Sequence, residues 1–367
     1  MARCAPIPRG VYNRAVLFLG IESSCDDTCA AVLDERGCVL SSIVSSQVRL
    51  HAPYGGVVPE IAARHHLEAV GPVVDRALAE AGTDLAGIAG IAVTHGPGLI
   101  GSLLVGLAYA RGLALRRGLP VVGVNHLEGH IASGWLECPA LPYPALALVV
   151  SGGHTALWRI ASPARYVETA RTRDDAAGEA FDKVAKMLGL AYPGGPVIDR
   201  LAERGNPLAV AFGEVRTKGE VAFSFSGYKT AARVYAQRSG IEPLAHPDDP
   251  PSSALLDLVA AFRYAVVREL VRRTRQAIQA ERPRALVLAG GVAANRLLRA
   301  EFTRLADTHG LALSIPPPRY CADNAAMIVK AALPRLLAGE DGTEGLDATA
   351  HLPLGGPEAT RRTRRHR

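Results

Sequence analysis

One pattern occurs twice in this chain and constrains its fold more than any other feature: an apolar run, a tight polar turn and a second apolar run. The first copy spans residues 15–33 around the turn 22–28, and the second spans residues 145–160 around the turn 151–154. Two apolar runs on either side of a polar turn predict a β-hairpin. The repeat therefore predicts two related halves, each of which opens with a hairpin.

Helical and strand patterns alternate after the first hairpin. Apolar residues recur at helical spacing over residues 60–81 and 99–117, and apolar runs at 88–94 and 120–124 predict strands. In the second half, the apolar run 286–289 is followed by a glycine turn and a helical pattern. This alternation predicts an α/β fold, in which ligands bind at the turns that follow strands.

The chain is long enough for two domains. It has 367 residues, 49% of them hydrophobic, which is sufficient for two cores of ordinary size. Three prolines within residues 137–144 predict a linker. The boundaries that we expect are an N-terminal extension at 1–15, a first lobe at 16–138 plus about 324–339, a second lobe at 139–323, and a polar, Arg-rich, disordered tail at 340–367.

Charge and cysteine content narrow the classes of function. The chain carries 41 Lys and Arg against 35 Asp and Glu, but five of the arginines lie in residues 361–367, so the charge of the body does not indicate nucleic acid. Six scattered cysteines form no disulfide framework, and Cys25 and Cys29 lack the spacing of a metal pair, so we expect structural cysteines in the cytoplasm. No apolar run has the length of a membrane span, and the N-terminus does not resemble a secretory signal.

Three glycine turns follow apolar runs, at residues 95–98, 151–153 and 290–291. Glycine lets a phosphate approach the backbone N–H groups closely, although a single turn of this kind is more often only a sharp turn. Three such turns together favour a nucleotide site. The chain contains no GxxxxGK[ST] sequence, so a P-loop assignment is not supported.

The pair His126 and His130 is the candidate for metal binding. Side chains four residues apart on a helix lie on one face, about 5–6 Å apart, and can share one metal ion. The spacing fits core or surface histidines equally well. A zinc peptidase would need a glutamate beside the first histidine, where Leu127 stands. Asp323, just ahead of a C-terminal helix, is the candidate third ligand, and it is equally well explained as a helix N-cap.

Four carboxylates lie within nine residues: Asp174, Asp175, Glu179 and Asp182. Such a cluster is unfavourable unless it is solvated, bound to a metal or hydrogen-bonded to a polar substrate. A solvated helix start explains it as well as a binding site does. We expect Asp182 to begin a helix and to meet the hydroxyl groups of a ribose.

Nine segments with characteristic sequences occur in order. They are residues 20–28, 51–65, 96–102, 124–130, 150–154, 174–183, 223–230, 290–295 and 321–327. On these segments the chain resembles the bacterial TsaD family, the tRNA N6-adenosine threonylcarbamoyltransferases, over about residues 16–338. Asp27 stands where many members have Glu, and Tyr228 where many have Leu.

The resemblance implies a fold and a reaction. The fold would be an α/β, actin/Hsp70/sugar-kinase-like (ASKHA) fold with two lobes, each a mixed sheet flanked by helices, and a nucleotide cleft between them. The reaction would transfer a threonylcarbamoyl group from threonylcarbamoyl-AMP to N6 of the adenosine just 3′ of the anticodon in tRNAs that read ANN codons, with release of AMP.

The resemblance also implies site residues. His126, His130 and Asp323 would hold one divalent metal, Fe²⁺ by preference and Zn²⁺ as the alternative. The adenylate would be bound at Val149, Val150, Ser151, Gly152, Gly153, Asp182, Gly195 and Asn295. The hypothesis that Asp26 and Asp27 act catalytically, by orienting the donor or the incoming amine, is our own.

The implied partners are tRNA, a paralogous inactive TsaB-like subunit, a small TsaE-like P-loop ATPase and an upstream threonylcarbamoyl-AMP synthase, with no membrane. Three other functions remain as alternatives at this point. A metallopeptidase would need the missing base, an inactive scaffold would lack the metal residues, and an ASKHA-fold phosphotransferase would have no use for the histidine pair. Residues 1–15 and the Arg-rich tail lie outside the resemblance and have no assigned role.

Overall fold

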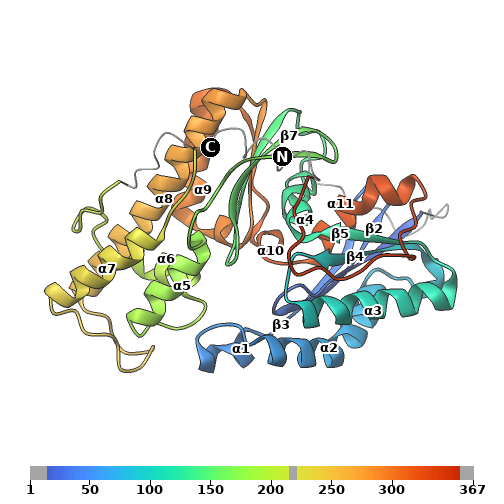
Figure 1. The fold of residues 1–367 in the computed structure, drawn as a ribbon, viewed down its shortest axis with the longest axis horizontal. Coiled ribbons are helices and arrows are strands. Elements are labelled where there is room, and N and C mark those ends of the chain that lie inside the picture. The colour runs from blue at the N-terminus through green and yellow to red at the C-terminus, as the bar shows by residue number, and fades with distance from the viewer. Residues whose placement is uncertain (1–14, 215–220, 356–367) are drawn as a thin grey trace. The chain divides into compact units, whose positions relative to one another are not determined.

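The structure is a computed structural model that describes residues 15–214 and 221–355 (Figure 1). Its internal contacts divide the described chain into two compact units. Unit 1 comprises residues 15–50, 57–140 and 323–355, and unit 2 comprises residues 51–56, 141–214 and 221–322. Asp323, which the sequence placed at the end of the second lobe, therefore belongs to unit 1.

The sheet of unit 1 has five strands in the order β3-β2-β1-β4-β5. These strands are β1 (Leu17–Glu22), β2 (Asp27–Asp34), β3 (Val39–Ser46), β4 (Ile88–Gly96) and β5 (Val121–Asn125). The β1–β2 and β2–β3 pairs are antiparallel, whereas β4 runs parallel to both β1 and β5. The predicted first hairpin is confirmed, and the parallel strands β1, β4 and β5 end at the same edge of the sheet.

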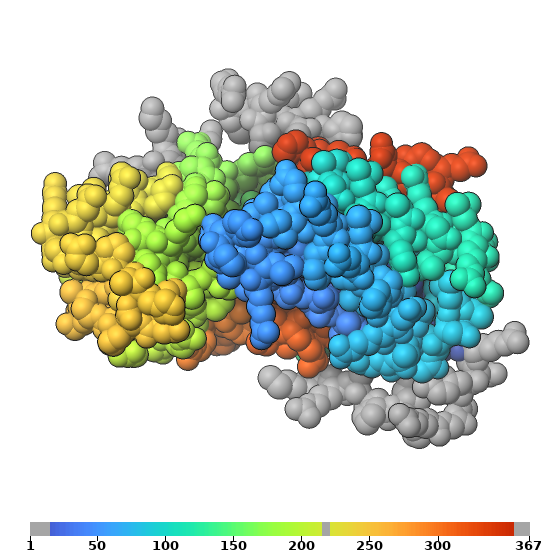
Figure 2. All heavy atoms as spheres, turned by 90° about the horizontal axis from the view of Figure 1, so that it is seen from below, coloured from blue at the N-terminus to red at the C-terminus, as the bar shows by residue number. Residues whose placement is uncertain are grey.

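Helices cover both faces of this sheet. Helices α2 (Pro59–Glu80) and α3 (Ile100–Arg117) pack on one face, and α11 (Ala325–Leu337) packs on the other together with α4 (His126–Ala132) (Figure 1). Figure 2 shows α2 and α3 from their outer side. On the inner side their apolar residues, such as Val74 and Leu107, join Leu19 and Ile21 of β1 in one core.

Unit 2 repeats this strand arrangement. Its sheet has the order β10-β9-β6-β7-β8. The strands are β6 (Ala145–Val150), β7 (Thr155–Ser162), β8 (Arg165–Arg171), β9 (Ala285–Ala289) and β10 (Ala312–Ser314). As in unit 1, three antiparallel strands are continued by two parallel ones. The repeat in the sequence is therefore a repeat of strand topology.

The core of unit 2 lies between one face of its sheet and the helices. These are α5 (Ala177–Met187), α6 (Gly194–Leu201), α7 (Ser226–Arg238), α8 (Ser253–Glu281) and α9 (Arg296–His309). Short elements complete the described chain: α1 (Val48–His51), α10 (Pro318–Cys321) and 3-10 turns at Ala52–Tyr54, Leu85–Gly87, Ser133–Trp135, Ala202–Arg204 and Gly291–Ala294. None of the described helices is both long and apolar enough to cross a membrane.

The C-terminal segment differs from its prediction. Residues 341–355, here called the C-terminal strap, pack against unit 1, so the expected disorder from residue 340 onward is wrong for this part. The strap binds the outer edge of β5, where Gly342 N donates to Val121 O over 2.8 Å and Val121 N donates to Asp341 Oδ1 over 3.2 Å. Composition did not reveal this because the strap is held by the unpaired backbone groups of an edge strand. Residues 356–367 lie outside the described chain.

The strap also reaches the start of α4. Asn125 Nδ2 donates to Leu352 O over 2.9 Å, Thr349 N donates to His95 O over 2.8 Å, and the side chain of Leu354 is buried. The strap therefore fixes the residue from which α4 begins.

Truncation after Glu340 should lower the free energy of unfolding of unit 1 by about 2 kcal/mol or more, because the burial of one leucine alone contributes about that much. Urea unfolding followed by the fluorescence of Trp135, which is buried in unit 1, measures the change. Truncation after Gly355 is the matched control and should leave unit 1 unchanged. Equal stability of the two truncated chains would contradict the role of the strap.

Candidate functional site

Helix α4 places two imidazoles side by side. It begins directly after β5, and the Asn125 side chain caps it by accepting a hydrogen bond from Leu127 N over 2.9 Å. His126 and His130 are one helical turn apart, both buried, with ring centroids separated by 4.6 Å. The structure therefore brings the predicted histidine pair to one face of one helix.

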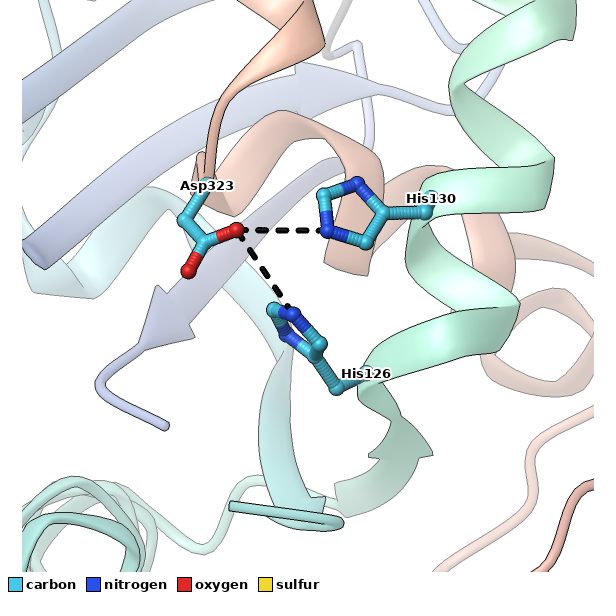
Figure 3. Close-up of side chains that lie close together, drawn as sticks. All are labelled: His126, His130 and Asp323. Carbon is cyan, nitrogen blue, oxygen red and sulfur yellow. Dashed lines mark ion pairs between the residues drawn. The ribbon is translucent and has the colours of Figure 1, made fainter. Parts of the chain in front are cut away.

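Asp323 reaches this pair from the far end of the chain (Figure 3). Its Oδ1 lies 3.2 Å from His130 Nε2 and 3.6 Å from His126 Nε2. Gly129 allows this approach, because a Cβ at that position would lie 2.7 Å from Ile328 Cδ1 on α11. The reading of Asp323 as a helix cap is wrong: the cap of α11 is Asn324, whose side chain accepts a hydrogen bond from Met327 N.

These three side chains fit a metal ion. One ligand atom from each lies within 4.8 Å of the others, and no other group of this kind occurs within residues 15–214 and 221–355. Both ring nitrogens of His130 are buried and make no hydrogen bond to any described residue. A buried ring nitrogen that makes no hydrogen bond is unfavourable unless a ligand satisfies it, and imidazole nitrogen binds Fe²⁺ and Zn²⁺ well.

Glu22, at the end of β1, lies behind His126. Its Oε2 is 3.1 Å from His126 Nδ1, and Ser24 Oγ is also 3.1 Å from that nitrogen. Burial opposes ionisation of Glu22, but the charge and hydrogen bond of His126 hold the pKa of Glu22 below its ordinary value. Burial likewise opposes charge on His126, but Asp323 and Glu22 raise its pKa to about 9. Sequence reasoning assigned Glu22 no role, although a glutamate directly after an apolar run was a usable signal.

Asp26 and Asp27 lie in the first hairpin turn and at the start of β2. Burial and the charge of Asp323 raise the pKa of Asp27 to about 7, and its Oδ1 is buried without a hydrogen bond to any described residue. The turn is anchored by His66 of α2, a residue that sequence reasoning missed. His66 Nε2 donates to Cys25 O over 3.0 Å, and its Nδ1 lies 2.7 Å from the Thr28 hydroxyl.

Cys25 and Cys29 are free, and neither belongs to a metal-ligand group among the described residues. The prediction that they are not a metal pair agrees with this.

Helix α4, which carries the two histidines, does not provide the base that a metallopeptidase needs. Glu128 lies between the histidines in sequence, but its Oε2 is 3.4 Å from the Arg335 guanidinium on α11. An ion pair with Arg335 occupies this carboxylate, which therefore does not serve as a base at the metal ligands.

The glycine turns of unit 2 meet at one edge of its sheet. Strands β6 and β9 are parallel, so the turn 151–153 and the turn 290–291 follow neighbouring strand ends. Gly290 has a φ of 91°, and a Cβ there would lie 2.7 Å from the carbonyl carbon of Val150. Gly178, at the start of α5, donates its N–H to Ser151 O over 3.3 Å. Gly152, Gly153, Gly195 and Gly291 face open space, as a phosphate-binding surface requires.

The other expected adenylate positions differ in what they offer. Val149 and Val150 are fully buried in β6, so only their backbone is available at the strand end. Asn295 is buried, and its Oδ1 caps α9 by accepting a hydrogen bond from Leu298 N over 3.0 Å. Asp182 lies inside α5 and does not begin it, contrary to our expectation. Its Oδ1 accepts a hydrogen bond from Gly194 N over 2.8 Å, which joins α5 to the start of α6.

The other three carboxylates of the acidic cluster have structural partners. Asp175 pairs with Lys183 and Lys229, each at 2.7 Å, and Lys183 also pairs with Glu179. Asp174 accepts hydrogen bonds from the backbone N–H groups and side chains at the start of α7. The cluster therefore holds helices of unit 2 in place, which the local sequence did not show because two of the partners lie about 50 residues further on.

Asp174→Ala should lower the free energy of unfolding of unit 2 by about 1 kcal/mol at neutral pH, the usual cost of a lost helix cap. Burial opposes ionisation, but hydrogen bonds from Ser224, Phe225 and Ser226 hold the pKa of Asp174 below its ordinary value. Since this pKa is depressed, the stabilisation is present above the pKa of the unfolded chain, about 3.9, and is lost as the pH falls through the folded pKa. Urea unfolding should therefore show a difference at pH 7 that shrinks near pH 3, with Asp307→Ala as an unaffected control. A difference independent of pH would contradict this role.

Comparisons with known proteins agree with this geometry. The family described as "TsaD: tRNA N6-adenosine threonylcarbamoyltransferase" matches residues 38–330. A protein of that name from Trichlorobacter lovleyi is 51% identical over 340 residues, covering 92% of this chain and 97% of its own, and one from Thermodesulfovibrio yellowstonii is 49% identical over 339 residues, covering 92% and 100%. Among solved structures, HypF of T. kodakarensis superposes with a TM-score of 0.58 at 16% identity, covering 91% of this chain and 49% of its own, which confirms the ASKHA fold class. The chain belongs to the TsaD family of tRNA N6-adenosine threonylcarbamoyltransferases.

Proposed function

We propose that this protein transfers a threonylcarbamoyl group from threonylcarbamoyl-AMP to N6 of the adenosine just 3′ of the anticodon in tRNAs that read ANN codons. Family membership supports the reaction class. The observation that carries the chemistry is that His126 and His130 meet Asp323, which lies almost 200 residues further along the chain, at one point of unit 1.

In this reaction, the enzyme has to position the N6 amine against threonylcarbamoyl-AMP more than it has to activate the leaving group. The N6 amine forms a bond to the carbamoyl carbon, the bond from that carbon to the phosphate oxygen breaks, AMP leaves, and N6 loses a proton. Because AMP is already a good leaving group, orientation of the two reactants and stabilisation of charge on the carbamoyl oxygen supply the acceleration. A metal ion held by His126, His130 and Asp323 would supply Lewis acidity for that oxygen or for the threonyl carboxylate.

The metal that we propose is Fe²⁺, with Zn²⁺ as the alternative. Two imidazoles and one carboxylate with open positions are the donor set typical of non-haem Fe²⁺ sites. In unit 2, we propose that the open glycines of the turn 151–153 and Gly195 receive the adenylate phosphate. The Asp182 carboxylate would bind the ribose, and the segment at Asn295 would contact the nucleotide.

In unit 1, we propose that Asp26 and Asp27 orient the donor or the incoming amine. The buried, unpaired Oδ1 of Asp27 and the anchoring of its turn by His66 support a held carboxylate at this position.

We further propose that the protein works in the cytoplasm with a paralogous TsaB-like subunit and a small TsaE-like P-loop ATPase. An upstream synthase would provide the threonylcarbamoyl-AMP, and tRNA would be the acceptor. The support for these partners is the family to which the chain belongs.

Reconstitution tests the function. The purified chain is incubated with threonylcarbamoyl-AMP, the two partner subunits and unmodified tRNA, and the tRNA is digested to nucleosides for mass spectrometry. The expected result is threonylcarbamoyl-adenosine in tRNAs that read ANN codons, and its loss when a required subunit is omitted. Peptide cleavage or phosphate transfer to a small acceptor, without the modified nucleoside, would instead support the peptidase or the phosphotransferase.

A further inference from the structure

We propose that Glu22 is a positioning residue that keeps the proton of the neutral His126 ring on Nδ1, so that Nε2 is free to bind the metal. The inference rests on the metal centre proposed above. It concerns residues of unit 1 only, and it assigns a role to a buried carboxylate that contacts neither substrate nor metal.

The side chain of Glu22 is fully buried, and each of its two oxygens accepts a hydrogen bond. Oε1 accepts a hydrogen bond from Ser24 N over 2.5 Å, and Oε2 accepts one from the Thr94 hydroxyl over 2.5 Å. Oε2 also lies 3.1 Å from His126 Nδ1, on the side of the ring opposite Nε2 and Asp323. A carboxylate only accepts hydrogen bonds, so Nδ1 donates to Oε2, and the Ser24 hydroxyl, whose Oγ also lies 3.1 Å from Nδ1, then faces this nitrogen as a second acceptor.

The position of this proton decides whether His126 can act as a ligand. A neutral imidazole has one N–H group, and the other nitrogen carries the lone pair that a metal uses. With the proton held on Nδ1 by Glu22, the lone pair lies on Nε2, which faces Asp323 and His130. Carboxylate partners of this kind fix the tautomer and the ring orientation of metal-binding histidines.

Replacement of Glu22 by glutamine should move the proton of the neutral His126 ring from Nδ1 to Nε2. Glutamine keeps one oxygen, and that oxygen must face the Ser24 N–H group, because a backbone donor cannot be turned into an acceptor. The NH₂ group then faces Thr94 and His126. The Thr94 hydroxyl can rotate to accept, but Nδ1 can accept only after its proton has moved to Nε2, the atom needed for the metal. The opposite orientation of the amide would set two buried donors against each other at Ser24.

The first test uses the wild-type protein. Long-range ¹H–¹⁵N correlation spectra of the metal-free protein, at a pH where the His126 ring is neutral, should show the proton on Nδ1. The same spectra of the Zn²⁺-loaded protein should show it there as well. A neutral wild-type ring protonated on Nε2 would overturn the inference without any variant.

The second test compares Glu22→Gln with Glu128→Gln, which makes the same chemical change at a buried glutamate of α4 that faces Arg335. Competition with a chromophoric chelator should show Zn²⁺ affinity lowered about 10- to 100-fold by Glu22→Gln and unchanged by Glu128→Gln. The metal-free spectra of Glu22→Gln should show the proton on Nε2. Thr94→Val, which keeps the carboxylate, should change affinity less than about threefold.

The outcomes separate this inference from the proposed function. If the wild-type protein binds no Zn²⁺ and no Fe²⁺, the metal centre itself is refuted. If it binds metal and Glu22→Gln binds equally tightly with Nδ1 still protonated, only the role of Glu22 is overturned. An equal loss of affinity in Glu22→Gln and Glu128→Gln would show a general effect of disturbing this part of unit 1, and would also overturn it.

Discussion

Asp323→Ala should lower the affinity of the purified protein for Fe²⁺ and Zn²⁺ by more than about 100-fold, which is the upper limit for loss of a partner outside the ligand set. Asp323 provides the only carboxylate of the cluster, and its Oδ1 lies within 3.6 Å of both histidine Nε2 atoms. Without it, only two neutral imidazoles remain as ligands, and no ligand carries a negative charge to balance the cation. Transfer to tRNA should be lost together with the metal.

Asp75→Ala is the matched control, because Asp75 is exposed on α2 in the same unit. Metal content by mass spectrometry and chelator competition give the affinities, and the thermal midpoint shows whether the variant is folded. If folded Asp323→Ala keeps the metal affinity of the wild-type protein, Asp323 is not a ligand.

The double variant Asp26→Asn/Asp27→Asn should lower kcat/KM for transfer by more than about 100-fold, the lower range for a group that handles a proton or orients a nucleophile. Asparagine preserves the size of each side chain and removes its charge. Binding of the adenylate should change less than about threefold, because the expected adenylate positions all belong to unit 2.

Rates of modified-nucleoside formation and equilibrium binding of a non-reactive adenylate analogue measure the two quantities separately. Asp75→Asn serves as the control for an aspartate change elsewhere in unit 1. Transfer at the wild-type rate in the double variant would refute a role for this turn in the reaction. If transfer and adenylate binding are lost in parallel, the turn binds the donor and has no separate role in the transfer step.

The parts of the fold that could be predicted are those with local patterns. The hairpins of β1–β2 and β6–β7 follow from apolar runs on either side of polar turns, and α2 and α3 follow from helical spacing. The C-terminal strap could not be predicted, because its partners are backbone groups of β5 more than 200 residues away. Composition describes the strap correctly as polar, but it does not show an edge strand that lacks a neighbour.

In the candidate site, too, local patterns could be predicted and long-range contacts could not. His126 and His130 could be paired from their spacing, whereas Asp323 and the neighbouring Asn324 look alike as helix-start residues. Only the structure shows that the Asn324 side chain makes the cap and that Asp323 faces the histidines. Glu22 was missed because its contacts to Thr94 and His126 join strand ends that are far apart in sequence.

Anomalous X-ray diffraction from crystals of the active protein, recorded on both sides of the iron and zinc absorption edges, tests the central claim most directly. The account predicts one metal ion bonded to Nε2 of His126, Nε2 of His130 and the carboxylate of Asp323, at about 2.0–2.2 Å from each. Protein that modifies tRNA while its anomalous map shows no metal at these three side chains, or a metal bound elsewhere, would contradict it.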